Sequence, residues 1–238
     1  MSKLSWDGVG NKKFETGTDR GVLYPQVKGA YPKGVAWNGL TAVTESPSGA
    51  DENAFYADNI KYGSLRGAED FGGTIECYTF PDEWAQCDGS IEATAGVILG
   101  QQKRLPFGMC FRTLIGNDAD GIDHGYKLHL IYNATVSPSE RAYETVNDSP
   151  EGITFSYEFT TTPINVSSVK DAKPVACITI DSTLVVAEKL KKLEDKLYGT
   201  DAGGGSGSGT EPTLPLPDEV IALLKTAYKL KVGHGSMP

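Results

Sequence analysis

Apolar and polar residues alternate over several short stretches of the chain, most clearly from Phe155 to Thr161. Phe155, Tyr157 and Phe159 occupy one set of alternate positions, and polar residues occupy the other. Because successive side chains of a strand point to opposite faces of a sheet, this pattern predicts a strand with an aromatic inner face and a polar outer face. Pro163 cannot donate a ladder hydrogen bond, so we expect the strand to end there.

The same alternation predicts further strands separated by turn residues. Phe107 to Ile115 and Tyr126 to Val136 are predicted to form a hairpin, because Gly116-Asn117-Asp118 favours a turn between them. We expect a long acidic loop at its tip. The remaining predicted strands are Thr41 to Thr44, Thr74 to Phe80 and Val175 to Ile180.

Helical signals are fewer. Pro81-Asp82-Glu83 favours the start of a short helix that Asp88-Gly89 ends. A longer amphipathic helix is predicted over Thr183 to Tyr198, capped by Asp181-Ser182. Its apolar stripe is predicted to cover one side of a sheet and consists of Val186, Leu190, Leu193 and Leu197.

These elements suggest a division of the chain into four parts. Residues 1–40 are expected to form an N-terminal arm with one or two short strands, and residues 41–200 a β domain with a flanking helix, interrupted by a loop at Glu45 to Asn53. Residues 201–210 have the composition of a flexible Gly/Ser linker. Residues 211–238 are predicted to be a docking segment with a short helix, started by Pro215-Leu216-Pro217-Asp218-Glu219. This helix is too short to be stable alone and must dock either on its own domain or on a neighbouring subunit.

Charge and cysteine content narrow the possible functions. The 238-residue chain has a formal net charge of −9, which argues against a protein that grips nucleic acid, since phosphate binding requires clustered Lys and Arg. The four cysteines form no CxxC pair, so we expect structural thiols and no zinc site. No apolar stretch suits a membrane span, and no leader is evident in MSKLSWDGVG, so we expect folding in a reducing cytoplasm.

Candidate chemical sites are weak, and the sequence predicts no catalytic, cofactor-binding or metal-binding residues and no cofactor. The loop from Asp118 to His124 is acidic but does not fit a calcium-binding EF-hand, so a solvated hairpin tip is favoured. The histidines, His124, His129 and His234, are too scattered to suggest shared ligation or a general base. Trp6, Trp37 and Trp84 could stack on sugars, but their spacing favours packing.

An ordered set of segments resembles the major tail tube proteins of long-tailed, non-contractile bacteriophages, in the branch common among phages and prophages of Gram-positive bacteria. The set comprises NAFYADNIKY at residues 53–62, the helix at Pro81, the Leu130-Ile131-Tyr132-Asn133 strand, GITFSYEFTTTP at residues 152–163 and the ending Leu214 to Val220. Between Ala42 and Pro163 the segments occur in the same order as in that family.

The resemblance implies a mainly β fold of two packed antiparallel sheets, a sandwich or partly closed barrel with a flanking α-helix. It also implies a structural virion protein that is not an enzyme. Six copies would form a ring, and stacked rings would form the tail tube that delivers the genome, with long loops and terminal arms bridging successive rings. Expected partners are further copies and the tape measure, terminator and distal tail proteins, with DNA passing through the lumen without specific binding and no membrane contact. The protein would be assembled in the bacterial cytoplasm and reside in the phage tail.

A second hypothesis comes from a different class. A β-sandwich carbohydrate-binding module that uses the acidic loop for calcium would also display alternating strands. The linker and apolar helix near the C-terminus favour the assembly protein, because a soluble binding module has little use for a detached apolar helix.

Overall fold

The computed structural model describes residues 4, 6–49, 51–143, 145, 152–201 and 209–225. The strands are β1 (Phe14–Pro25), β2 (Val35–Trp37), β3 (Leu40–Glu45), β4 (Ser48–Gly49), β5 (Glu52–Ala57), β6 (Ile60–Arg66), β7 (Glu69–Asp70), β8 (Gly72–Cys77), β9 (Ile91–Thr94), β10 (Val97–Leu99), β11 (Phe107–Asn117), β12 (Gly121–Val136), β13 (Phe155–Thr161) and β14 (Cys177–Asp181). The helices are a 3-10 turn, η1 (Asp82–Trp84), which runs into α1 (Ala85–Asp88), followed by α2 (Ala187–Tyr198) and α3 (Pro217–Leu224).

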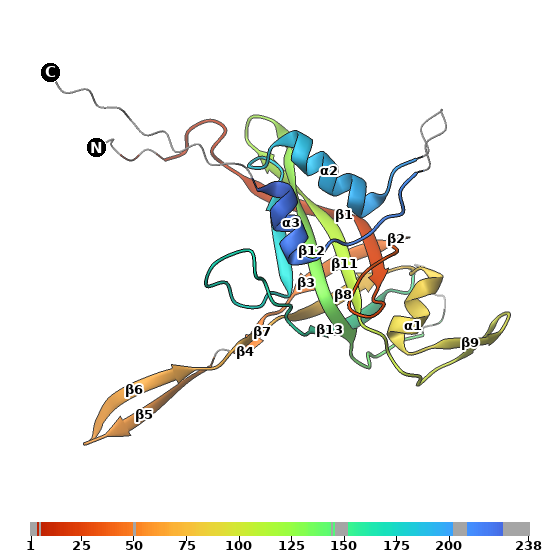
Figure 1. Cartoon of the computed structure of the whole chain (residues 1–238), viewed down its shortest axis with the longest axis horizontal. Coiled ribbons are helices and arrows are strands. Elements are labelled where there is room, and N and C mark those ends of the chain that lie inside the picture. Colours follow the sequence, from red (N-terminus) through yellow and green to blue (C-terminus); the bar gives the residue numbers. More distant parts are fainter. Residues whose placement is uncertain are drawn as a thin grey trace.

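Eight strands form one antiparallel sheet in the order β2-β1-β11-β12-β13-β8-β3, with β14 also paired to β12. The end strands of this order, β2 and β3, are consecutive in the chain and only Asn38 and Gly39 separate them. The sheet therefore curls until its ends approach, but among the described residues β2 and β3 do not pair and the barrel stays open. This confirms the predicted mainly β, antiparallel and partly closed fold, in which the packed layers belong to one continuous curled sheet (Figure 1).

The inside of the curl holds an aromatic core. Trp84 is fully buried, with its ring centroid 4.6 Å from that of Trp37 and 5.0 Å from that of Phe107. Tyr157 and Phe159 pack in the same cluster, as the alternation along β13 predicts. Burial of such large rings is the dominant stabilising contribution in a core of this kind.

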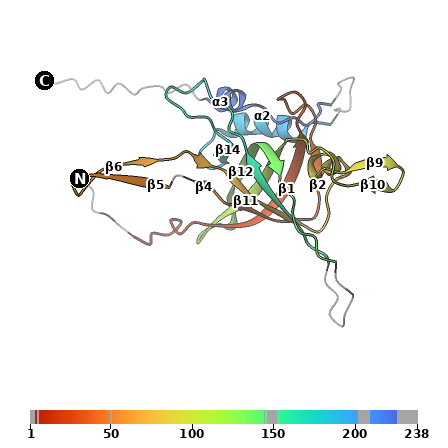
Figure 2. The same cartoon turned by 90° about the horizontal axis from the view of Figure 1, so that it is seen from below.

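The opposite face of β1, β11, β12 and β14 is covered by helices (Figure 2). Leu190, Leu193 and Leu197 of α2 pack there with Leu128 and Leu130 of β12. α3 joins the same cluster through Val220, which is 1% exposed. The flanking helix expected from the sequence is thus present, and a second helix packs beside it.

The described part of residues 1–40 is more than an arm. β1 pairs with β11 from Phe14 to Pro25, and Leu23 and Tyr24 are fully buried. Two bulges interrupt this pairing. A bulge breaks strict alternation, which explains why the sequence pattern did not reveal a long strand.

Other expected boundaries also differ. Within Glu45 to Asn53, predicted to be a loop, the structure has β4 and the start of β5. The acidic hairpin tip is short, because β12 already begins at Gly121. α2 begins at Ala187 with Val186 as N-cap and without a side-chain cap, since the Asp181 carboxylate instead accepts bonds from the Thr183 amide and hydroxyl.

The described part of the C-terminal segment docks on its own chain, which is one of the two alternatives that the sequence leaves open. Leu214 is 3% exposed, the Tyr132 hydroxyl donates to the Pro215 carbonyl at 3.0 Å, and the Thr213 amide donates to the Lys196 carbonyl at 2.7 Å. Thr200 and Thr210 bridge the two ends of the predicted linker. Of that linker, residues 202–208 lie outside the described residues, as do residues 226–238.

Candidate self-assembly surface

The four strands β4 to β7 form a long two-stranded extension, here called the arm, that projects away from the curled sheet (Figures 1 and 2). β4 pairs with β7 at its base and β5 pairs with β6 further out. Asp58 and Asn59 turn the chain at the tip with φ values of 51° and 63°. This left-handed pair is typical of a tight hairpin turn, and Asp and Asn tolerate it better than most residues.

The arm carries large apolar and aromatic side chains that the other described residues of the chain do not cover. Tyr56 and Tyr62 are each 71% exposed and Leu65 is 69% exposed; Phe55 and Ile60 are also exposed. Soluble monomers rarely display an apolar patch of this kind, which is typical of an interaction surface. NAFYADNIKY, the first segment of the sequence resemblance, is the outer half of the arm.

Ion pairs join the two outer strands of the arm, β5 and β6. Lys61 Nζ lies 2.6 Å from Glu52 Oε1 across the two strands, and Arg66 Nη2 lies 3.6 Å from Glu52 Oε2. The hydrogen bond from Lys61 is the main reason that the pKa of Glu52 lies below its ordinary value. These exposed pairs contribute little stability, but they favour the register that displays the aromatic side chains.

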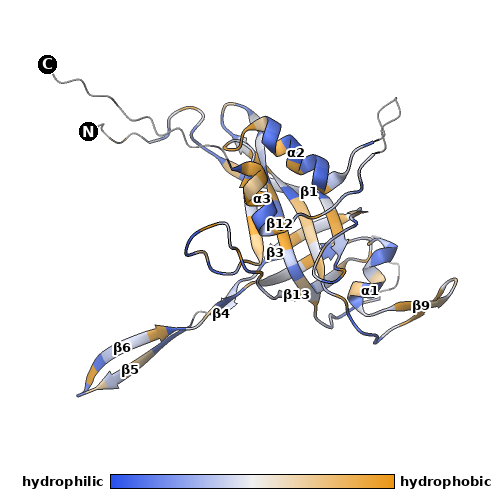
Figure 3. Cartoon of the chain, in the orientation of Figure 1, coloured by the Kyte–Doolittle hydropathy of each residue, from blue (hydrophilic) through white to orange (hydrophobic). Residues whose placement is uncertain are grey.

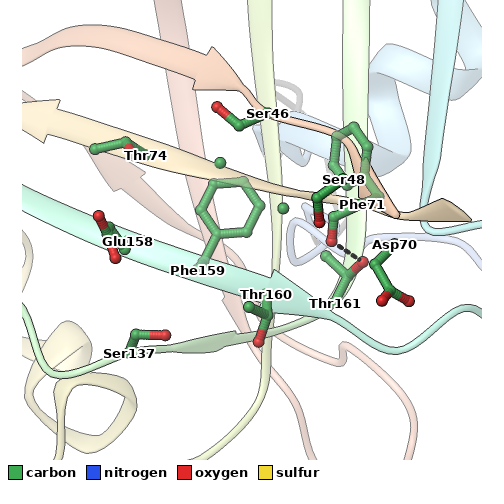
Figure 4. A pocket seen from close by; sticks show the side chains of 12 residues that line it. Ser46, Ser48, Asp70, Phe71, Thr74, Ser137, Glu158, Phe159, Thr160 and Thr161 are labelled. Atoms are coloured by element: carbon green, nitrogen blue, oxygen red, sulfur yellow. Dashed lines mark hydrogen bonds between the residues drawn. The ribbon is translucent and has the colours of Figure 1, made fainter. Parts of the chain in front are cut away.

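The arm leaves the sheet beside a pocket of about 470 Å³ (Figure 4). Its lining comes from the base of the arm, β8, β13 and Ser137, with the carboxylates of Asp70 and Glu158 among serine and threonine side chains. The Thr161 hydroxyl donates to the Phe71 carbonyl at 2.7 Å, which ties the arm to the sheet. The described lining includes acidic but no basic side chains, so the pocket is ill suited to hold an anion.

The sheet leaves strand edges unpaired. Among the described strands, β14 pairs only with β12 and β3 only with β8. An open edge presents backbone N–H and C=O groups that can pair with another strand, so it favours association unless it is covered. The arm and these edges together form the candidate self-assembly surface.

The acidic tip considered for calcium is occupied by protein donors. Asp118 Oδ1 accepts the Gly10 and Lys12 amides at 2.9 and 3.3 Å. Asp120 Oδ2 lies 2.9 Å from His124 Nδ1, and the hydrogen bond from His124 is the first cause that lowers the pKa of Asp120. Throughout the described part of the chain, no three His, Cys, Asp or Glu side chains gather in a metal-binding group.

His129 is the histidine with the most suggestive neighbours. Its Nε2 lies 2.9 Å from the Thr113 hydroxyl, and its Nδ1 lies 3.6 Å from Glu45 Oε1. Its ring also stacks on Phe111, with centroids 4.6 Å apart. The hydrogen bond joins the neighbouring strands β11 and β12, and Nδ1 has no hydrogen-bond partner among the described residues, so we interpret His129 as a structural residue of the sheet. His234 lies outside the described residues.

Of the remaining candidates, Trp37, Trp84 and the buried cysteines contribute to packing. Trp37 and Trp84 contact each other in the core, whereas Trp6 is 77% exposed, so the three share no sugar-binding platform. All four cysteines are free thiols, and burial raises the pKa of Cys87 and of Cys110 to about 12. At neutral pH these two thiols stay protonated and poorly nucleophilic.

Sequence reasoning missed the apolar surface of the arm and the whole β9–β10 hairpin. Gly96 is a turn signal between the segment Ile91 to Thr94 and the apolar run Val97-Ile98-Leu99, and it could have revealed the hairpin. None of the helices in the described ranges is long and apolar enough to cross a membrane.

Comparison with known proteins gives structural likeness alone. No protein-family model matches the chain, and no curated protein matches it. A chain of an extracellular contractile injection system, in its extended sheath–tube complex, is 13% identical, with a TM-score of 0.30 over 68% of this chain and 88% of that one. The tube-terminating cap of the anti-feeding prophage is 11% identical, with a TM-score of 0.31 over 76% of this chain and 97% of that one. At these scores the likeness assigns no function.

Proposed function

We propose that this chain is a structural protein of a tail tube, which self-assembles into rings that stack into a hollow conduit. The observation that carries the proposal is the arm, whose exposed aromatic side chains have no partner surface within the described residues of the same chain. A second copy of the chain is the partner that would cover them in every protomer at once.

The fold supplies the second requirement of such an assembly. A surface that contacts a different surface on the next copy produces a ring where the rotation closes, and rings can then stack along their axis. The open edges of β3 and β14 can pair with strands of a neighbour and so satisfy their backbone groups. The arm projects beyond the sheet. It would therefore contact a different copy from the one whose strands pair with the open edges.

The ordered sequence segments support the finer part of the proposal. They resemble siphophage tail tube proteins, for which six copies a ring, a virion location and passage of the genome are expected. Six copies with a net charge of −9 each would carry −54 per ring, and a negative bore would not retain DNA. Tape measure, terminator and distal tail proteins are the further partners expected on this hypothesis.

Sedimentation and native mass measurements on the purified chain test the proposal. We expect species whose mass is six chains or a multiple of six, unchanged by EDTA. A stable monomer at all concentrations would contradict the tube. A monomer that unfolds more easily after chelation would instead support the calcium-dependent binding module.

A further inference from the structure

The β9–β10 hairpin is a second projecting element with an uncovered apolar surface (Figures 1 and 3). Val97 pairs with Thr94 and Leu99 with Ile91, and one residue of β9 is bulged between them. Ile91, Val97 and Leu99 therefore share one face, while Glu92 and Ile98 share the other. The four aliphatic side chains of the hairpin are 48% to 67% exposed.

The hairpin has an acidic base. The lining of a pocket of about 400 Å³ includes Ile91 and the acidic residues Asp82, Glu83 and Glu92. No Lys or Arg is among its described lining residues. An apolar face, a second face with a carboxylate and an acidic pocket together fit a partner strand that alternates apolar and basic side chains.

A segment of that chemistry lies near the C-terminus. Residues 226–238 lie beyond α3 and outside the described structure, and their sequence includes Tyr228-Lys229-Leu230-Lys231-Val232. Apolar residues alternate with lysines in this stretch, and the thirteen residues contain no Asp or Glu. In strand conformation, Tyr228, Leu230 and Val232 would share one face and the two lysines the other.

We propose that residues 228–232 of one copy add as a strand to the β9–β10 hairpin of a neighbouring copy. The apolar side chains of the added strand lie on the same face of the hairpin as Ile91, Val97 and Leu99. Its lysines lie on the other face, toward Glu92 and the acidic pocket. Among the described strands β9 and β10 pair only with each other, so each has a free edge for the added strand. The inference deepens the proposed function, because it names one contact by which copies of the chain hold together.

The positions of α3, after which the tail begins, and of the β9–β10 hairpin favour pairing with a neighbouring copy over pairing within the same chain. α3 packs beside α2 on the helical face, whereas the hairpin projects from the far side of the molecule in both views (Figures 1 and 2). Thirteen residues extend to at most about 43 Å, at roughly 3.3 Å a residue. Part of that length would be consumed in passing around the body before any pairing with its own hairpin.

Disulfide trapping between full-length single-site variants tests the contact. Val97→Cys and Leu230→Cys chains are mixed under assembly conditions and oxidised, and a disulfide-linked dimer is expected from the mixture. Lys192→Cys, on the exposed face of α2, replaces Val97→Cys as the matched control and is expected to give at least several-fold less dimer. Reversing the tail charge with Lys229→Glu and Lys231→Glu is expected to reduce the trapped dimer by a similar factor.

The outcomes separate this contact from the tube itself. Assembled particles without a trapped dimer would overturn the inference and leave the proposed function standing. A trapped dimer without larger particles would support the contact and contradict the tube. A chain carrying both cysteines that closes only on itself would also overturn the inference, since it would place the tail on its own hairpin.

Discussion

Asp218 shows how a single residue attaches the C-terminal segment to the body. Its carboxylate accepts the Ser167 amide through both oxygens at 3.1 Å, the Ser167 hydroxyl at 2.5 Å and the Ser168 amide at 2.9 Å. These bonds, led by that of Ser167, hold the pKa of Asp218 far below its ordinary value. The residue also lies in the first turn of α3, where a negative charge is favourable.

The lowered pKa of Asp218 gives stability a defined pH dependence. A carboxylate whose pKa is lower in the folded chain stabilises it fully above the unfolded value of 3.8, and the contribution is lost as pH falls through the folded value. We expect Asp218→Asn to lower the Tm at neutral pH, with a difference from wild type that shrinks below about pH 4. Thermal denaturation followed by circular dichroism measures it. Glu219→Gln, which removes a charge from the same turn without breaking these bonds, should change the Tm less.

A prediction about the core follows from the position of Leu214. Its side chain is 3% exposed in the cluster under α2 and α3, so Leu214→Ala removes buried apolar contacts and leaves a cavity. We expect the free energy of unfolding to fall by about 2–5 kcal/mol, measured by urea denaturation. A change near zero would mean that this part of the C-terminal segment does not contribute to the folded core of its own chain.

Among the elements of the fold, the arm is expected to be needed for assembly but not for folding. Its outer strands, β5 and β6, make their ladder with each other, and their aromatic side chains are largely solvent-exposed. Surface substitutions of this kind change stability by about 0.5 kcal/mol or less. The arm can therefore be altered without loss of the fold.

The double variant Tyr56→Ser and Tyr62→Ser is expected to keep the wild-type Tm and to lose the large species in sedimentation velocity. Leu184→Ser is the matched control, because Leu184 is 82% exposed and lies outside the arm. If the double variant assembles as wild type does, the arm is not the assembly surface. If it unfolds, the arm contributes to the fold more than its exposure indicates.

At the scale of the whole molecule, the sequence predicts what depends on local pattern. Strict alternation located β13, and an apolar stripe located α2, where Leu190, Leu193 and Leu197 are buried as expected. Elements that depend on distant partners were missed or misplaced. β1 is interrupted by bulges, and the burial of Leu214 depends on Tyr31 and α2, which no local signal predicts.

The candidate self-assembly surface was also predictable only where it depends on local sequence pattern. NAFYADNIKY stood out as a segment, but its alternation does not reveal that neither face of the hairpin is buried, because exposure is set by how the arm leaves the sheet. The acidic tip was correctly interpreted as a polar hairpin turn, although its use of Asp118 to hold Gly10 and Lys12 needed the folded chain. The sequence position of an acidic residue does not indicate which backbone amides will donate hydrogen bonds to its carboxylate.

Electron microscopy of the purified wild-type chain shows directly whether copies cover one another's arms and open edges to form a hollow assembly. We expect rings with a central channel, stacked into tubes. Uniform single particles of the size of one chain, at concentrations where tubes should form, would contradict it.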